Sequence, residues 1–308
     1  MNIDFHTHLL DREWLPKDWW RWLETYYAKP RGAFGRLFSH KYKRKLEELW
    51  DPEGRKLIAG MDSAGIDVSV VLPLDFGVRF NEPKISIIEQ HRLIAQVVSA
   101  YPSRMIGFVG VDPRRPDARD IIETGIEELG FKGIKLHPGT GFSLNNPEFS
   151  FIWEKAAEKK IPVLVHTGQA FGPLLSKYCR PTILDDILAN YPDVRIVGAH
   201  LAGGWFDELC WMGYTKPNFY ADISLWQIRC RMNKADFAGS IRKAVDMFGP
   251  DRLLFGTDWP FSNSVMESSE YVRSIKELGV SSETGSNFIS AEIRCLLGKN
   301  AERLLQIR

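Results

Sequence analysis

The sequence predicts a single (β/α)8 barrel, a TIM barrel, with an aromatic helical insertion after its first strand. Three observations predict this fold. The chain has 308 residues, a length that suits such barrels. Strand-like runs alternate with segments of helical periodicity, a pattern typical of parallel βαβ units. Histidines gather at the ends of the runs, where barrels place functional residues. We therefore predict one domain over residues 1–308, with the insertion at about 9–53.

The first strand covers about residues 3–8, and seven more apolar runs have strand character. These runs lie at 67–72, 105–111, 133–137, 162–166, 195–200, 219–223 and 253–258. Helical periodicity occupies 55–64, 89–101, 118–129, 149–159, 182–190, 206–212 and 237–248. A doubly wound open sheet is the alternative, but it rarely supplies eight evenly spaced parallel strands. The tail at 272–308 predicts closing helices, with Gly298-Lys299-Asn300 capping the last one.

The insertion differs in composition from the rest of the chain. It mixes many Lys and Arg residues with Trp14, Trp19, Trp20, Trp22, Tyr26, Tyr27, Phe34, Phe38 and Trp50. This predicts helices whose aromatic side packs on the main body. Two roles stay open, a surface cap over the barrel edge and a lid over the substrate. Exposed tryptophans within 14–22 would also suit a dimer contact.

Charge and cysteine content exclude several protein classes. The 40 basic and 39 acidic residues give a net charge of +1, so no field attracts nucleic acid or an anionic membrane. Scattered cysteines indicate buried thiols in a reducing compartment; they are Cys179, Cys210, Cys230 and Cys295. The start of the chain lacks a signal-peptide pattern, and no apolar run approaches about 18 residues. We expect a cytoplasmic protein that acts on a small molecule and leave a homo-oligomer open.

The first strand carries the most informative motif, Ile3-Asp4-Phe5-His6-Thr7-His8. Alternate residues of a strand point to the same side, so His6 and His8 project together. Two imidazoles presented in this way form half of a metal site. A bare His-x-His is equally compatible with two ordinary histidines, so the remaining ligands must be found downstream.

Five of the seven histidines lie at the predicted C-terminal ends of strands. They are His6, His8, His137, His166 and His200, and Asp258 ends the last strand at the same level. Buried imidazoles need polar partners, so this convergence favours a functional site over packing. We interpret the other two, His40 and His91, as surface or structural residues.

Imidazoles combined with a carboxylate suit Zn²⁺, with Mn²⁺, Fe²⁺ or Co²⁺ as substitutes. Such a site lowers the pKa of a bound water toward about 7 and produces a nucleophile at neutral pH. Asp258 is the candidate to take that water's proton and pass it to a leaving group. His200 could bind the metal, orient the water or stabilise a developing oxyanion.

The ordered set of strand-end residues resembles the amidohydrolase superfamily. It consists of His6-Thr7-His8, Lys135, His166, His200 and Asp258 on strands 1, 4, 5, 6 and 8. Three further segments resemble the amidohydrolase-related branch that contains aminocarboxymuconate-semialdehyde decarboxylase. They are Gly130-Phe131-Lys132-Gly133-Ile134-Lys135-Leu136-His137-Pro138, Gly256-Thr257-Asp258-Trp259-Pro260 and Gly298-Lys299-Asn300-Ala301-Glu302-Arg303-Leu304-Leu305. The resemblance spans the chain except the insertion.

The resemblance implies one metal held by His6, His8, His166 and Asp258. His200 would be the catalytic histidine or a ligand of a second ion. In binuclear members a carboxylated lysine on strand 4 bridges two metals, and Lys135 stands there, facing the same side as His137. Lys135 could instead pair with Asp4 or Asp222, or bind a substrate carboxylate. We take one metal as the working prediction, with Lys135, His137 and His200 as candidate second-metal or substrate ligands.

Several residues near the predicted mouth are weaker candidates. Asp222 and Ser224 could position substrate, although a helix N-cap is an equal role for Ser224. The segments Gly139-Thr140-Gly141-Phe142 and Gly203-Gly204-Trp205 are predicted loops that could form turns or supply backbone donors. Arg79 and Arg114 could bind a carboxylate or remain exposed charges.

The leading hypothesis is a metal-dependent hydrolase that cleaves an amide, ester or lactone bond through metal-activated water. The alternative is a non-oxidative decarboxylase of an aromatic or dienoic acid, an activity that the resemblance places in the same branch. A barrel that binds ligands without catalysis is a third class, but all the expected metal ligands are present.

Overall fold

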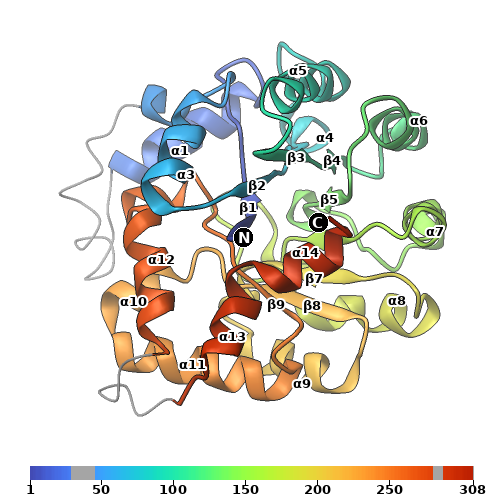
Figure 1. The fold of residues 1–308 in the computed structure, drawn as a ribbon. Coiled ribbons are helices and arrows are strands. Elements are labelled where there is room, and N and C mark those ends of the chain that lie inside the picture. The colour runs from blue at the N-terminus through green and yellow to red at the C-terminus, as the bar shows by residue number, and fades with distance from the viewer. Residues whose placement is uncertain (29–45, 280–286, 308) are drawn as a thin grey trace.

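The chain forms a closed barrel of parallel strands surrounded by helices, which confirms the predicted (β/α)8 architecture (Figure 1). The computed structural model describes residues 1–28, 46–279 and 287–307. The strands are β1 (Ile3–Thr7), β2 (Val68–Val71), β3 (Met105–Gly107), β4 (Val109–Gly110), β5 (Ile134–Leu136), β6 (Val163–Val165), β7 (Ile196–Gly198), β8 (Phe219–Asp222) and β9 (Leu253–Leu254). All paired strands are parallel.

Two contacts close the barrel between its first and last strands. The backbone N–H of Phe5 donates to the carbonyl of Phe255 at 2.9 Å, and Thr7 forms a parallel bridge with Trp259. The predicted strand at 105–111 is divided at Phe108, so β3 belongs to one sheet and β4 to the other. β3 and β4 together fill one strand position of the barrel. The strands β1 to β9 therefore occupy the eight positions that the sequence predicted.

Helices ring the strands in Figure 1, and α14 passes in front of them near both termini. The helices are α1 (Lys17–Ala28), α3 (Arg55–Ala64), α4 (Gly77–Phe80), α5 (Ile87–Ala100), α6 (Ala118–Glu123), α7 (Ser150–Lys159), α8 (Asp185–Asn190), α9 (Phe206–Thr215), α10 (Gln227–Met232), α11 (Lys234–Phe248), α12 (Ser268–Glu277), α13 (Ser290–Arg294) and α14 (Asn300–Leu305). The sequence did not predict the short helices α4 and α10. No helix in the described part of the chain is long and apolar enough to cross a membrane.

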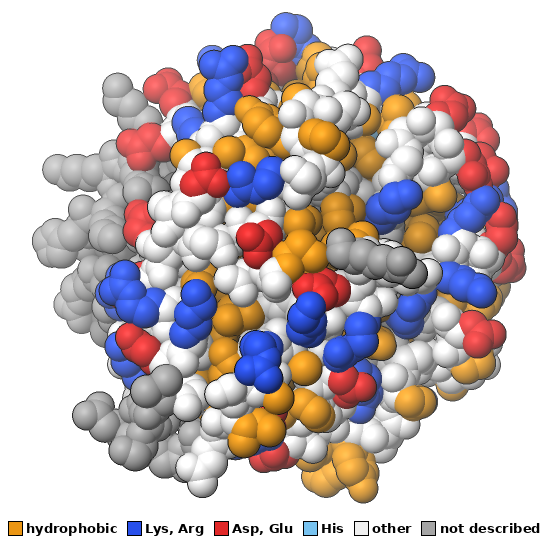
Figure 2. All heavy atoms as spheres, viewed as in Figure 1, with side chains coloured by type: hydrophobic (Ala, Val, Ile, Leu, Met, Phe, Trp, Pro, Cys, Tyr) orange, Lys and Arg blue, Asp and Glu red, His pale blue; other side chains and the backbone are white. Residues whose placement is uncertain are grey.

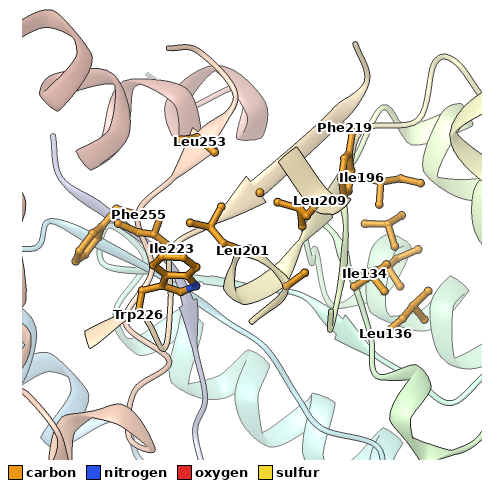
Figure 3. Packing of buried hydrophobic residues seen from close by; sticks show 14 of the residues in the cluster. Ile134, Leu136, Ile196, Leu201, Leu209, Phe219, Ile223, Trp226, Leu253 and Phe255 are labelled. Carbon is orange, nitrogen blue, oxygen red and sulfur yellow. The ribbon is translucent and has the colours of Figure 1, made fainter. Parts of the chain in front are cut away.

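Strand alternation divides the buried side chains into two layers. Ile134, Leu136 and Ile196 pack between strands and helices, where Leu209 of α9 and Phe219 join them (Figure 3). The strand residues that point to the opposite side form a second cluster with residues of α14. This cluster includes Leu164, Val197, Leu304 and Leu305. Because Lys135 lies between Ile134 and Leu136, the same alternation directs its side chain away from the helices.

The structure corrects the predicted helix cap at Gly298-Lys299-Asn300. No side chain caps the N-terminus of α14. The Asn300 amide instead donates to the carbonyls of Pro250 and Leu253, at 2.9 and 2.7 Å. Asn300 therefore ties α14 to the segment leading into β9. The four cysteines are free, as the sequence predicted.

Gly298 allows the turn before α14 to approach the first residue of the chain. A Cβ atom there would overlap the carbonyl oxygen of Met1, whereas one on Gly239 of α11 would meet nothing within 4 Å. We expect Gly298→Ala to lower the free energy of unfolding by about 1–3 kcal/mol. Gly239→Ala should raise it by about 0.5–1 kcal/mol through helix propensity. Urea denaturation measures both, and equal stability of the two variants would contradict this contact.

The insertion packs against the barrel, as predicted, through α1 and the short turn η1 (Leu46–Leu49). Trp19 and Trp20 of α1 cluster with Leu74, Phe76 and Leu174, which come from loops after strands. Trp14, Trp19 and Trp20 are only 4, 5 and 6% exposed, so the exposed surface that would have suited a dimer contact is not present at these three residues. The insertion residues Phe34 and Phe38, and His40, lie outside the described residues.

The face seen in Figure 2 carries interspersed basic and acidic side chains with small hydrophobic areas between them. Ion pairs occur at the surface of the described residues, for example between Lys299 and Glu302 at 2.6 Å. Exposed pairs of this kind contribute little to stability. On this face, charge of one sign does not form a continuous surface.

Candidate functional site

The carboxyl ends of the strands bring together the predicted site residues. His6 belongs to β1 and His8 follows it. His166 comes directly after β6, and His200 and Asp258 lie in the loops that follow β7 and β9. All five side chains are buried, with at most 7% exposure. His137, after β5, is partly buried beside them.

His6, His8 and Asp258 form the first group of potential metal ligands, with their ligand atoms within 4.8 Å of one another. Asp258 Oδ1 lies 3.2 Å from His8 Nε2 and 3.6 Å from His6 Nε2. The opposite nitrogens donate hydrogen bonds, His8 Nδ1 to the Leu72 carbonyl at 2.6 Å and His6 Nδ1 to Asp222 Oδ2 at 2.8 Å. Both rings therefore present Nε2 lone pairs toward Asp258, which is how such bonds orient metal-binding imidazoles.

His166 and His200 lie against this group. His166 Nδ1 is 3.2 Å from His200 Nε2, and the His200 ring centroid is 4.7 Å from that of His6. His166 Nε2 is buried and has no hydrogen-bond partner among the described residues. A buried polar atom without a partner is costly, so His166 Nε2 is a further candidate ligand atom.

The backbone of His200 is unusual. His200, Leu201 and Ala202 have φ values of 59°, 42° and 45°, in the left-handed region that non-glycine residues rarely adopt. The His200 N–H donates to Asp222 Oδ1 at 3.0 Å, and its carbonyl accepts from Trp226 Nε1 at 2.6 Å. These two hydrogen bonds stabilise the left-handed backbone of His200, a conformation that costs free energy on its own. Such strained residues are common at functional sites.

Asp222 is a residue whose role the sequence did not identify. It is fully buried at the end of β8 and accepts hydrogen bonds from His6 Nδ1, from the N–H groups of His200 and Ser224, and from the Ser224 hydroxyl. His6, His200 and Asp222 are a second close group of potential ligands, but these bonds already use the carboxylate. Asp222 thus orients histidines, and the alternation of Asp222-x-Ser224 at a strand end is the signal that could have revealed it.

Lys135 and His137 complete the polar surroundings. Lys135 is 2% exposed, and its Nζ lies 3.3 Å from His6 Nε2. Neither Asp4 nor Asp222, its predicted alternatives, hydrogen-bonds to it in the described part of the chain; Asp4 binds Thr257 instead, at 2.6 Å. The His137 ring stacks on His166 with centroids 4.0 Å apart.

Burial sets the charge state of these groups. It lowers the pKa of His6, His137 and His166 well below the usual value and lowers the pKa of His200 to about 3. It also lowers the pKa of Lys135 to about 8. Desolvation disfavours the charged form of each group. These imidazoles are therefore neutral near pH 7, with a lone pair for a cation or a proton.

Comparison with known proteins then identifies the family. A family model described as amidohydrolase matches residues 3–307. The chain belongs to the amidohydrolase family. This match covers almost the whole chain and confirms the resemblance that the strand-end residues indicated.

Two curated relatives of this chain are decarboxylases by name. The 2-amino-3-carboxymuconate-6-semialdehyde decarboxylase of Dictyostelium discoideum is 25% identical over 353 residues, covering 99% of this chain and 94% of the relative. The gamma-resorcylate decarboxylase of a Polaromonas strain is 24% identical over 213 residues, covering 55% of this chain and 64% of the relative. The prediction of a hydrolase acting on an amide, ester or lactone is therefore wrong, because these relatives favour the alternative.

A solved structure shows the same fold. The 5-carboxyvanillate decarboxylase of Novosphingobium aromaticivorans, complexed with manganese and 4-hydroxy-3-methoxy-5-nitrobenzoic acid, has a TM-score of 0.67. The two sequences are 19% identical, and the match covers 100% of this chain and 96% of the other. At this identity the likeness shows the barrel fold alone.

Aromatic side chains flank the histidines. Phe76 meets the His137 ring edge-on at 5.2 Å, and Phe261 meets His8 at 5.6 Å. Trp19 of the insertion packs on Phe76 at 4.9 Å, so the insertion reaches the site through the Phe76 ring. Both phenylalanines lie in loops without periodicity, so no sequence pattern indicated them.

The remaining candidates have roles other than those the sequence offered for them. Arg79 donates to the Pro173 carbonyl at 2.9 Å, and Arg114 pairs with Asp112 at 2.6 Å. Ser224 does not cap α10, whose N-cap is Trp226. His91 is structural, since its Nε2 accepts from the Gly110 N–H at 3.1 Å.

The two weaker loop segments are also structured. Residues 138–140 form a short 3-10 turn in which the Thr140 hydroxyl donates to Asp112 at 2.8 Å. In the other segment, the Gly203 carbonyl accepts from the N–H of Gln169 at 2.9 Å. Both segments therefore join neighbouring loops, and each also bonds the backbone of a site histidine: the Thr140 N–H donates to the His137 carbonyl and the Gly203 N–H to the His200 carbonyl, each at 3.1 Å.

Proposed function

We propose that the chain is a metal-dependent, non-oxidative decarboxylase of a small aromatic or dienoic carboxylic acid. The observation that carries the proposal is the match, over 99% of the chain, to a relative named as such a decarboxylase. The buried group of His6, His8 and Asp258 supports it. The aromatic rings of Phe76 and Phe261 beside the histidines suit a planar substrate.

The residues fit a divalent metal. His6 and His8 would bind it through Nε2 and Asp258 through its carboxylate. His166 is not part of that close group, and its buried Nε2 without a partner makes it the candidate fourth ligand. This donor set suits Zn²⁺ and also accommodates Mn²⁺, the ion bound in the solved 5-carboxyvanillate decarboxylase. When bound, the metal would draw electron density from an oxygen of the substrate.

The chain's own groups would handle the proton. Decarboxylation replaces a carbon–carboxylate bond with a carbon–hydrogen bond: a proton is added to the carbon, and carbon dioxide leaves without the bonding electron pair. Asp258 would carry this proton, and His200 would hydrogen-bond the substrate beside it. Lys135, the buried cation next to His6, would bind the substrate carboxylate. The carboxylation of Lys135 and a ligand role for His137 stay predictions.

Product analysis tests the proposal. The purified protein would be incubated with 2-amino-3-carboxymuconate-6-semialdehyde, gamma-resorcylate and 5-carboxyvanillate in ²H₂O enriched in ¹⁸O. We expect carbon dioxide, one deuterium at the former carboxyl carbon and no ¹⁸O in the phenolic products. Removal of metal with a chelator should abolish the reaction, and Zn²⁺ or Mn²⁺ should restore it.

Two outcomes would contradict the proposal. One is a phenolic product of gamma-resorcylate or 5-carboxyvanillate that contains oxygen from water, because that labelling is the signature of hydrolysis, whereas the oxygen of an aldehyde exchanges with water without an enzyme. The other is full activity in protein shown by elemental analysis to lack transition metal. A panel on which none of the acids releases carbon dioxide would remove the support given by the curated relatives.

A further inference from the structure

Ser224 connects His200 to Asp222. Its hydroxyl lies 2.7 Å from His200 Nδ1 and makes a short hydrogen bond to Asp222 Oδ1. Ser224 and Asp222 are both fully buried, and His200 is 5% exposed. The serine therefore lies behind the histidine ring, on the side opposite the Nε2 atom that faces His166.

The hydrogen-bond network permits one arrangement of protons. The Asp222 carboxylate only accepts, so the single proton of Ser224 is directed to Asp222 Oδ1. Ser224 Oγ must then accept from His200 Nδ1, which places the ring proton on Nδ1 and a lone pair on Nε2. His6 Nδ1, 3.1 Å from Ser224 Oγ, donates to the closer Asp222 Oδ2 at 2.8 Å.

The same reasoning extends to His166. Because His200 Nε2 carries a lone pair, the contact of 3.2 Å requires His166 Nδ1 to donate. The His166 lone pair then lies on Nε2, the atom without a partner among the described residues. The order of protons that begins at Asp222 thus leaves His166 ready to bind a cation.

We propose that Ser224 is a positioning residue that fixes His200 as the Nδ1–H tautomer, with Nε2 as an acceptor that His166 Nδ1 occupies in the free protein and that a substrate donor would take over on binding. The inference rests on the proposed function for its catalytic consequence, although the tautomer itself does not depend on it. Without the serine hydroxyl, His200 Nδ1 would have no partner at 2.7 Å. The ring would then be free to place its proton on Nε2 and present a donor to the substrate.

Histidine NMR measures the tautomer directly. Long-range ¹H–¹⁵N spectra of Zn²⁺-loaded and metal-free protein labelled with ¹⁵N-histidine distinguish Nδ1–H from Nε2–H rings, and His200→Gln assigns the His200 signals. We expect Nδ1–H in the wild type, a mixture or Nε2–H in Ser224→Ala, and Nδ1–H again in Ser224→Thr, which restores a hydroxyl. An Nε2–H ring in the wild type would overturn the proposal. This measurement on the wild type stays decisive even if the Ser224 variants do not fold.

Kinetics provide the second readout. Loss of one hydrogen bond to His200 should lower kcat about tenfold in Ser224→Ala, with KM and bound metal little changed. The matched control is Ser69→Ala, which removes a buried hydroxyl of β2 that has no hydrogen-bond partner among the residues the structure describes; it should leave the tautomer and kcat unchanged. An unaltered His200 tautomer in Ser224→Ala would refute the role of the serine. If the tautomer changes but no acid is decarboxylated, the positioning role stands and the proposed function fails.

Discussion

Asp258→Asn should lower kcat for decarboxylation by at least about 10³-fold while leaving the fold intact. The asparagine amide cannot carry the proton that Asp258 is proposed to deliver, and such transfer contributes about 10²–10⁴-fold. The substitution also removes the negative charge 3.2 Å from His8 Nε2, so bound metal should decrease. Single-turnover kinetics, thermal unfolding and elemental analysis measure the three effects.

The backbone makes asparagine the suitable replacement. Asp258 has a φ of 57°, a left-handed conformation that Asn tolerates better than most residues. Its N–H donates to the His6 carbonyl at 2.8 Å, a bond that the substitution keeps. Asp251→Asn, at an exposed position just before β9, is the matched control and should retain full activity. Retention of activity within tenfold by Asp258→Asn would show that another group delivers the proton.

The sequence predicted the barrel because its evidence is periodic. Apolar runs spaced by helical segments determine which residues lie on strands, and strand alternation then places Lys135 away from Ile134 and Leu136. The same rule located His6, His166, His200 and Asp258 at one end of the barrel. The division of the third strand at Phe108 was not predictable, because an apolar run does not reveal where its pairing changes sheets.

Features of the site that depend on tertiary contacts could not be predicted. The left-handed backbone at His200 is held by Asp222 and Trp226, and no local pattern reports those bonds. The contact of Phe76 with His137 depends on how a loop and the insertion pack together. The sequence predicted that the aromatic side of the insertion packs on the barrel, but not that Trp19 and Trp20 would meet Leu74, Phe76 and Leu174, because those partners come from loops without periodicity.

Asp222→Asn should weaken metal binding by about 10–100-fold, the usual effect of removing a group that orients a ligand. Asparagine has one acceptor oxygen, whereas Asp222 accepts from His6 Nδ1 on one oxygen and from His200 and Ser224 on the other. In either orientation of the asparagine amide, its NH₂ group would face a buried hydrogen-bond donor, either His6 Nδ1 or the donors of His200 and Ser224. Chelator competition should report the weaker binding, and urea denaturation a loss of about 1–3 kcal/mol.

Asp75→Asn separates orientation from general destabilisation. Asp75 is also a buried carboxylate, but it pairs with Arg115 at 2.6 Å and makes no hydrogen bond to a site histidine. Its substitution should lower the free energy of unfolding and leave metal affinity within about twofold of the wild type, since no imidazole loses its acceptor. Equal losses of metal affinity in both variants would mean that stability alone controls binding. A loss confined to Asp222→Asn would show that this carboxylate holds His6 in its metal-binding orientation.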